Sequence, residues 1–194
     1  MKSTRLPRAL LAVALAVGIG AAAATPASAA ATGGSPGQDC GYFIETGATV
    51  CVPHGADLNG AIYAQTGKTV VEMSANGVTA LTAPESKQAS SGMTVSPASN
   101  SFIIGKLFDD INYGGGSYEI LASGPCASGT PTWYLNDVGS AWYGRVSSFQ
   151  GYSNCNVTIY EGTYQTGAQL GPLSYSAWVG AAMNDRTKSV KLTY

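Results

Sequence analysis

Two stretches of equal length determine the fold: Phe108-Asp-Asp-Ile-Asn-Tyr-Gly-Gly115 and Tyr160-Glu-Gly-Thr-Tyr-Gln-Thr-Gly167. Each stretch begins with an aromatic residue and ends with a glycine, with six residues between them. An aromatic ring at the start of a hairpin can fold over it and cover the core, and a glycine at the far side supplies the positive φ that such a hairpin needs. The two stretches therefore predict two folded β-hairpins.

A second pair of similar segments follows the hairpins in the same order. Val138–Phe149 and Val179–Val190 align without a gap, and five of their twelve positions are identical. The two hairpin stretches start 52 residues apart, whereas the later segments start 41 apart. The first copy therefore carries about 11 extra residues. We place this insert within 121–136, around Cys126.

Apolar residues alternate after each hairpin, at Tyr118 and Ile120 in the first copy and at Leu170 and Leu173 in the second. Such alternation is typical of strands with one buried face. Two such units can pack as two sheets face to face, with a core of alternating inward residues. We therefore expect an all-β fold, with a two-motif Greek-key β-sandwich over residues 101–194.

The first half of the chain has a different composition, because residues 101–194 hold 15 of the 18 aromatic residues. We expect a small β-rich segment over 40–81 and a linker, rich in Ser, Ala and Pro, over 82–100. The sequence does not decide whether 40–81 folds alone, pairs its strands with those of the second half or only attaches to the surface of the second half.

Within 40–81 the sequence predicts four short strands joined by turns. They are Tyr42–Glu45, Thr49–Val52, Ala61–Ala64 and Thr69–Met73. The dipeptide Asn76-Gly77 lies between two β-rich runs and predicts a hairpin turn.

The first 29 residues resemble a secretory signal peptide. A basic start is followed by an apolar run and by Ala27-Ser28-Ala29, which fits the small-x-small cleavage rule. Without Lys2, Arg5 and Arg8 the chain has 7 basic against 11 acidic residues, a formal charge of −4. We therefore expect a secreted, extracellular protein that does not bind nucleic acid, which requires clustered Lys and Arg. The mature chain has no further apolar run that would span a membrane, and its start, 30–39, is expected to be disordered.

Four cysteines, Cys40, Cys51, Cys126 and Cys155, allow three disulfide pairings. Export favours disulfides over free thiols. Metal binding is the weaker interpretation, because there is no Cys-x-x-Cys and the single histidine, His54, is not at ligand spacing from two cysteines. We favour Cys40–Cys51 with Cys126–Cys155, since each pair falls within one half of the chain.

Residues 103–194 resemble the βγ-crystallin superfamily. The aromatic-x6-glycine pattern matches its Greek-key signature at Phe108/Gly115 and again at Tyr160/Gly167. The resemblance extends to actinobacterial secreted members, which include metalloproteinase inhibitors and killer-toxin-like proteins. It implies a Greek-key sandwich, and nothing in 30–100 takes part in it.

The resemblance also implies calcium as a ligand. Calcium-binding members carry (Asn/Asp)-(Asn/Asp)-x-x-(Ser/Thr)-Ser, and each site combines groups from both motifs. The second copy matches with Asn184 and Asp185 but has Lys188 in the fifth position, and the first copy matches only with Ser147 and Ser148. Asp185 and Ser147 can therefore build one weak calcium site. Alternatively, Asn184-Asp185 forms a turn and the serines hydrogen-bond to the backbone.

No catalytic constellation is recognisable, so we expect a protein that is not an enzyme. His54 lies between Pro53 and Gly55 in a predicted turn, and no nucleophile motif accompanies it. Asp109 and Asp110 are adjacent, so their carboxylates would point apart rather than act as a catalytic pair. Asp110 or Asp109 can instead add a ligand near a calcium site.

Three functions are compatible with these observations. The first is a secreted, monomeric binding protein of βγ-crystallin type with one weak calcium site. The second is a secreted peptidase inhibitor whose partner is an extracellular protease and whose inhibitory loop is the insert 122–132. The third is a killer-toxin-like antimicrobial protein, although the charge of −4 disfavours electrostatic attack on anionic membranes.

Overall fold

The computed structural model of the protein describes residues 37–74, 77–81 and 99–194. The predicted signal peptide 1–29, residues 30–36, Asn76 and the predicted linker 82–100, except its last two residues, lie outside the described residues.

The described chain contains twelve strands and one α-helix, α1 (Leu58–Thr66). The strands are β1 (Gln38–Phe43), β2 (Thr49–Pro53), β3 (Thr69–Ser74), β4 (Gly77–Leu81), β5 (Asn100–Phe108), β6 (Ser117–Ala122), β7 (Trp133–Leu135), β8 (Ser148–Gly151), β9 (Asn156–Tyr160), β10 (Gln169–Leu173), β11 (Tyr175–Ser176) and β12 (Ser189–Thr193). Two 3₁₀ turns, Ile111–Tyr113 and Ser140–Trp142, complete the regular structure.

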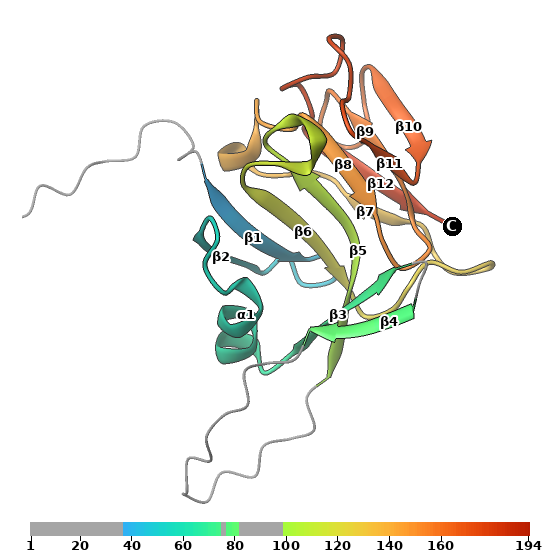
Figure 1. Cartoon of the computed structure of the whole chain (residues 1–194). Coiled ribbons are helices and arrows are strands. Elements are labelled where there is room, and N and C mark those ends of the chain that lie inside the picture. Colours follow the sequence, from blue (N-terminus) through green and yellow to red (C-terminus); the bar gives the residue numbers. More distant parts are fainter. Residues whose placement is uncertain (1–36, 75–76, 82–98) are drawn as a thin grey trace, which may run out of the picture. The chain divides into compact units, whose positions relative to one another are not determined.

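Two sheets form a β-sandwich, as predicted (Figure 1). The smaller has the order β10-β9-β12-β7, and the larger runs β11-β8-β5-β6-β1-β2, with β3 beside β5 and β4 beside β3. We call β5–β8 the first motif and β9–β12 the second motif. β7 of the first motif pairs with β12, and β11 of the second pairs with β8. Each sheet thus receives one strand from the other motif.

The sandwich core lies between the two sheets and is built from both motifs. Ile104, Leu107 and Ile120 come from the first motif, and Val157 and Ile159 come from the second; all five are fully buried. Tyr118 and Ile120 pack in this core as expected, but Glu119 and Leu121 are buried as well, so β6 is buried on both faces and the predicted single buried face is wrong there.

In the second motif Leu173 is 41% exposed, so the expected burial of this residue is wrong. β10 is an edge strand of the smaller sheet, and its pairing with β9 shifts register between Leu170 and Leu173.

The N-terminal segment pairs with the first motif rather than folding alone. β1 lies parallel to β6, and β3 lies parallel to the start of β5. β1 begins at Gln38, so residues 38 and 39, which we expected to be disordered, belong to the sheet. Asp39 holds this end, because its carboxylate accepts hydrogen bonds from the backbone N–H groups of Gly55 (2.8 Å) and Ser117 (2.9 Å).

The predicted strand Ala61–Ala64 is wrong, because these residues belong to α1. The Asp57 side chain accepts a hydrogen bond from Gly60 N and caps the helix, and Gly67 ends it with φ of 68°. Leu58 and Ile62, one helical turn apart, pack with Phe43, Ile103 and Leu121 in a second, smaller core. The predicted strands Thr49–Val52 and Thr69–Met73 correspond to β2 and β3, whereas Tyr42–Glu45 overlaps only the last two residues of β1, because Ile44 and Glu45 lie in the turn that follows. β3 pairs with β4 as the predicted hairpin requires.

Both favoured disulfides are present, Cys40–Cys51 and Cys126–Cys155. The first joins directly opposed residues of β1 and β2. The second fixes the predicted insert, which the structure places between β6 and β7 as residues 123–132, to the turn that precedes β9. In the second motif Ser174 alone connects β10 to β11.

Candidate functional site

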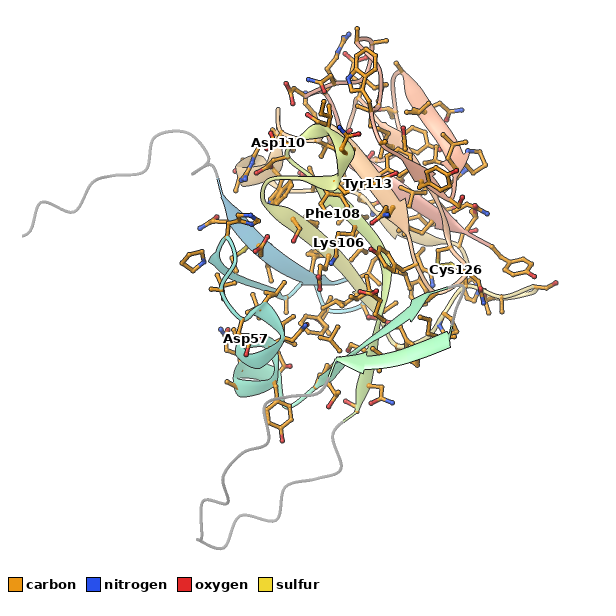
Figure 2. The ribbon with its side chains drawn as sticks, in the orientation of Figure 1. Asp57, Lys106, Phe108, Asp110, Tyr113 and Cys126 are labelled. Carbon is orange, nitrogen blue, oxygen red and sulfur yellow. A yellow bond between two sulfur atoms is a disulfide. The ribbon has the colours of Figure 1, made fainter. Side chains whose placement is uncertain are left out.

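The two folded hairpins have the same backbone. Gly115 and Gly167 have φ of 71° and 80°, and Phe108 and Tyr160 are buried beneath the hairpins, 8% and 6% exposed. Figure 2 shows Phe108, Asp110 and Tyr113 on the first hairpin, where the Phe108 and Tyr113 rings meet edge to face at 5.7 Å between centroids. The two motif glycines thus have a positive φ, and the two motif aromatic residues are buried.

One buried serine closes each hairpin. The Ser148 hydroxyl donates to Asp110 O (2.6 Å) and accepts from Tyr113 N (3.0 Å). Ser189 makes the matching bonds to Gly162 O (2.6 Å) and from Gln165 N (2.9 Å). Both serines are fully buried. Ser148, a predicted metal ligand, therefore holds the hairpin from inside.

An arginine also joins each hairpin to the segment that follows it. Arg145 donates through Nε and Nη2 to the two carboxylate oxygens of Asp109, at 2.8 and 2.5 Å, and its guanidinium lies over the Trp142 ring at 4.4 Å. Arg186 pairs with Glu161 in the equivalent position. The charge of Asp109 is thereby neutralised by Arg145 within the fold. Of the two adjacent aspartates, Asp110 is the one whose carboxylate is available to a ligand.

The motifs exchange contacts where their later segments meet. Val138 N donates to Lys188 O (2.9 Å) in the second motif, and Val179 N donates to Ser147 O (3.0 Å) in the first. This exchange brings Ser147 and Asp185 together, with 3.5 Å between Ser147 Oγ and Asp185 Oδ1. The structure thus places side by side the two residues that the sequence predicted to share a site.

The surroundings of Ser147 and Asp185 are rich in oxygen atoms. Asp110 from the first hairpin lines the same depression as Ser147 and Asp185, and Asn184 lies with Asp110 and Ser147 along an adjoining one. Asn184 Nδ2 donates to Asp185 Oδ2 (2.7 Å), and Asp185 N donates to Val146 O (3.1 Å), which fixes the turn. The junction offers a hydroxyl, two carboxylates and an amide oxygen. Within the described part of the chain, no group of three or more His, Cys, Asp or Glu is placed to hold a metal ion.

The equivalent junction on the other side carries a positive charge of its own. Lys188 stands where Ser147 stands in the first motif, and its Nζ lies 5.6 Å from the centre of the Tyr143 ring. The Tyr143 hydroxyl donates to Asp137 at 2.8 Å, and this hydrogen bond raises the pKa of Tyr143 above its usual value. Gly144 replaces the aspartate. This junction therefore lacks the Asn, Asp and Ser side chains of the motif and holds an ammonium group.

The single histidine does not form a catalytic triad. His54 Nδ1 lies 3.1 Å from both carboxylate oxygens of Asp39, and the Ser117 hydroxyl donates to the same carboxylate (2.9 Å). Histidine and serine therefore both bond to the aspartate instead of to each other. A general base must contact its nucleophile, so this cluster anchors β1 rather than activating Ser117.

Sequence reasoning missed a buried ion pair on the face of the larger sheet that bears α1. Lys106 Nζ lies 2.6 Å from Glu119 Oε1, and both side chains are mostly buried. Burial alone would lower the pKa of Lys106, but the Glu119 carboxylate raises it above its usual value. Lysine and glutamate at directly paired positions of β5 and β6 were the available signal.

No family model matches the chain, and no curated protein matches its sequence. Among solved structures, the chain is similar to a βγ-crystallin domain from Clostridium beijerinckii, with 28% identity over 46% of this chain and 97% of that domain and a TM-score of 0.37. It is similar to a clostrillin double mutant in complex with nickel (27% identity, 47% and 98% covered, TM-score 0.37). A βγ-crystallin domain from Flavobacterium johnsoniae is 17% identical (46% and 92% covered, TM-score 0.33).

None of the described helices is long and apolar enough to cross a membrane.

Proposed function

We propose that the protein is a secreted, non-enzymatic binding protein of βγ-crystallin type that holds one calcium ion between its motifs. The approach of Ser147 Oγ to Asp185 Oδ1 carries this proposal. Ser147 belongs to the first motif and Asp185 to the second. The backbone hydrogen bonds between the later segments of the two motifs bring these side chains together.

The oxygen atoms at this junction suit a hard cation. Calcium takes six to eight oxygens from carboxylates, carbonyls, hydroxyls and water. Asp185, Ser147 and Asp110 would supply three side-chain ligands, with backbone carbonyls and water completing the shell. Because only two carboxylates take part and Asp185 is exposed, we expect weak binding.

Secretion is supported by the two disulfides and by the signal-like first 29 residues. Disulfides persist in oxidising compartments and are rare in the cytosol. An extracellular location also supplies the millimolar calcium that a weak site requires.

Thermal unfolding with EDTA and then with a calcium series tests the proposal. At 100 times its dissociation constant a ligand adds about 2.7 kcal/mol, which for a chain of this size raises the midpoint by about 5–11 °C. Asp185→Ala removes the side-chain oxygens and should abolish the rise, whereas Asp57→Asn removes an equal charge, keeps a good helix cap and should preserve it. A flat calcium response of the unaltered protein, or an equal rise in Asp185→Ala, contradicts the proposal.

A second candidate, the peptidase inhibitor, is favoured by the geometry of the insert 123–132. Residues 128–131 are exposed, whereas Cys126 is buried and bonded to Cys155. Three hydrogen bonds between Ala127 and Thr130 close a tight turn at the tip. A loop held in this way loses little entropy when it docks into a protease cleft. Titration against metallo-, serine and cysteine proteases tests this candidate, and no inhibition at micromolar concentration contradicts it.

A further inference from the structure

A groove at the far end of β8 from the Ser147–Asp185 junction has a lining of a different kind. It runs past the end of β8, the turn to β9, and β11, with a volume of about 760 Å³. Ligand pockets commonly measure about 300–1,000 Å³. Its lining residues are Met73, Gln150, Gly151, Tyr152, Ser153, Asn154, Cys155, Asn156, Ser174, Tyr175 and Tyr194.

Three tyrosines give this groove its aromatic surface. Tyr175 and Tyr194 are 65% and 68% exposed, and Tyr152 is half-buried. Exposed apolar side chains that are scattered singly are normal, whereas those gathered along one groove mark a candidate ligand-binding surface. The faces of tyrosine rings pack well against the C–H groups of a flat ligand.

Amides and hydroxyls provide the rest of the chemistry. Tyr175 is directly paired with Gln150 across β11 and β8. Gln150 Oε1 accepts from the Tyr152 hydroxyl (2.8 Å), which leaves Nε2 as the donor end of that amide. Asn154 and Asn156 line the turn beside them. Such groups donate and accept hydrogen bonds without carrying charge.

The lining contains no Lys, Arg, His, Asp or Glu side chain. A phosphate, a nucleic acid or an acidic peptide would find no cationic partner in it. A fatty acid needs an enclosed apolar cavity, whereas this groove is open and carries three amide and two serine side chains besides its tyrosines. The ligand that fits is flat on one face, neutral and rich in hydroxyl groups.

The groove is rigid before any ligand binds. Cys155 is bonded to Cys126, and the Ser153 hydroxyl donates to Ile103 O (2.7 Å). Ser153 N donates to Met73 O (3.1 Å), so the turn is also tied to β3. A preformed site loses less entropy on binding than a mobile one.

We propose that this groove binds a neutral polysaccharide, with sugar rings stacked on Tyr175 and Tyr194 and sugar hydroxyls hydrogen-bonded to Gln150, Asn154 and Asn156. This function is separate from calcium binding, because no residue of the Ser147–Asp185 junction lines the groove.

Isothermal titration of the full, oxidised chain with cellohexaose, xylohexaose, mannohexaose and chitohexaose tests the proposal, and a galacturonic acid hexamer serves as the anionic comparison. EDTA in the buffer keeps the result independent of calcium. We expect saturable binding of at least one neutral hexamer and none of the anionic one. No heat from any neutral hexamer up to about 5 mM, or equal binding of the anionic hexamer, overturns the proposal.

Variants then assign binding to the groove. Tyr175→Ala should weaken binding about tenfold, whereas Tyr175→Phe keeps the ring and should change it by less than about threefold. Gln150→Glu retains the acceptor for Tyr152 but loses the amide donor, and should weaken binding about fivefold. The matched control is Tyr134→Ala, which removes a ring 51% exposed on β7, outside the groove, and should leave affinity unchanged. Equal affinities of Tyr175→Ala and the unaltered chain, with both folded by circular dichroism, overturn the assignment.

Discussion

The first and second motifs have the same backbone exchange but different side chains where they meet. At one junction Ser147 and Asp185 present oxygen atoms 3.5 Å apart. At the other, Lys188 places its own ammonium group over Tyr143, 5.6 Å from the ring centre. The first junction presents side-chain oxygens beside the paired Arg145 and Asp109, whereas the second carries the ammonium group of Lys188. The comparison shows that a duplicated scaffold can keep its backbone while the side chains at its two junctions differ in charge and in oxygen content.

The motifs also differ in their neighbours. β6 of the first motif pairs with β1 on its outer side, whereas its counterpart β10 is an edge strand of the smaller sheet. The arginine pairs follow the same trend. The Arg145 and Asp109 side chains are 11% and 14% exposed, but Arg186 and Glu161 are 52% and 35% exposed. The first motif is thus the more enclosed of the two.

The largest expected effect comes from Arg145→Ala. Removing one partner of a buried ion pair costs about 3–5 kcal/mol, because the other charge stays buried, and the cation–π contact with Trp142 is lost as well. The control Arg186→Ala removes an exposed pair that contributes about 0–1 kcal/mol. Denaturant unfolding measures both. Equal losses would show that the two motifs are equally enclosed.

Asp39→Asn should destabilise the protein by about 3 kcal/mol at neutral pH, because it weakens several hydrogen bonds to a charged acceptor. Burial would raise the pKa of Asp39, but hydrogen bonds from Gly55, His54 and Ser117 lower it below its usual value. Since the folded-state pKa is depressed, this stabilisation is present above the unfolded pKa of about 3.9 and is lost as pH falls through the folded pKa.

The difference between Asp39→Asn and the unaltered protein should therefore shrink below about pH 3.9. Urea unfolding at a series of pH values measures it. A difference that is constant from neutral to acid pH would mean that the Asp39 carboxylate does not hold β1 to β6.

The third prediction concerns a variant in which the second junction, at Tyr143 and Lys188, gains oxygen ligands. Combining Tyr143→Asn, Gly144→Asp and Lys188→Ser supplies the Asn, Asp and Ser side chains of the motif, and position 144 already has the positive φ (72°) that Asp185 adopts (59°). We expect the calcium stoichiometry to rise from one to two, with about 2.7 kcal/mol of added stability at 100 times the dissociation constant. Equilibrium dialysis measures the stoichiometry.

Lys188→Ser alone is the control for this variant, because it removes the ammonium group without supplying an aspartate. It should bind one calcium ion. A folded triple variant that also binds one ion would show that more than the side chains of the motif distinguishes the two junctions.

The smallest effect is expected from the hairpin glycines. Gly167→Ala should cost about 1–2 kcal/mol, since an L-residue is strained at its φ of 80°. Gly115→Ala should cost more, because the added Cβ would lie 2.9 Å from Asp109 Cβ, against 3.4 Å from Glu161 Cβ at Gly167. Thermal unfolding compares the two. A larger loss of stability in Gly167→Ala than in Gly115→Ala would contradict the inference that the first motif is the more enclosed of the two.

The sandwich could be predicted because its signals are local. In each motif the aromatic residue and the glycine belong to the same hairpin. Each disulfide joins two residues within one half of the chain. The pairing of Ser147 with Asp185 also followed from the motif, although the sequence did not show that the hairpin encloses Ser148. Calcium binding at this junction stays a prediction, which thermal unfolding with EDTA and a calcium series tests.

The predictions from the sequence were wrong where tertiary contacts or helix caps determine the secondary structure. Asp57 and Gly67 bracket α1 and were available as cap signals, but the short apolar run Ala61–Ala64 alone does not distinguish a strand from a buried helix. The parallel pairing of β1 with β6 depends on a contact between Asp39 and Ser117, 78 positions later in the chain. No periodicity in the sequence indicates such a distant partner.

The parallel pairing of β1 with β6 sets an order of assembly during synthesis. β1 leaves the ribosome long before β6 exists, so it cannot find its place in the sheet until the first motif has been made. Pairings between distant segments form slowly, because the intervening chain must close first. The earliest described strand to be synthesised is therefore among the last to dock, and until then β6 presents the free edge that β1 later covers.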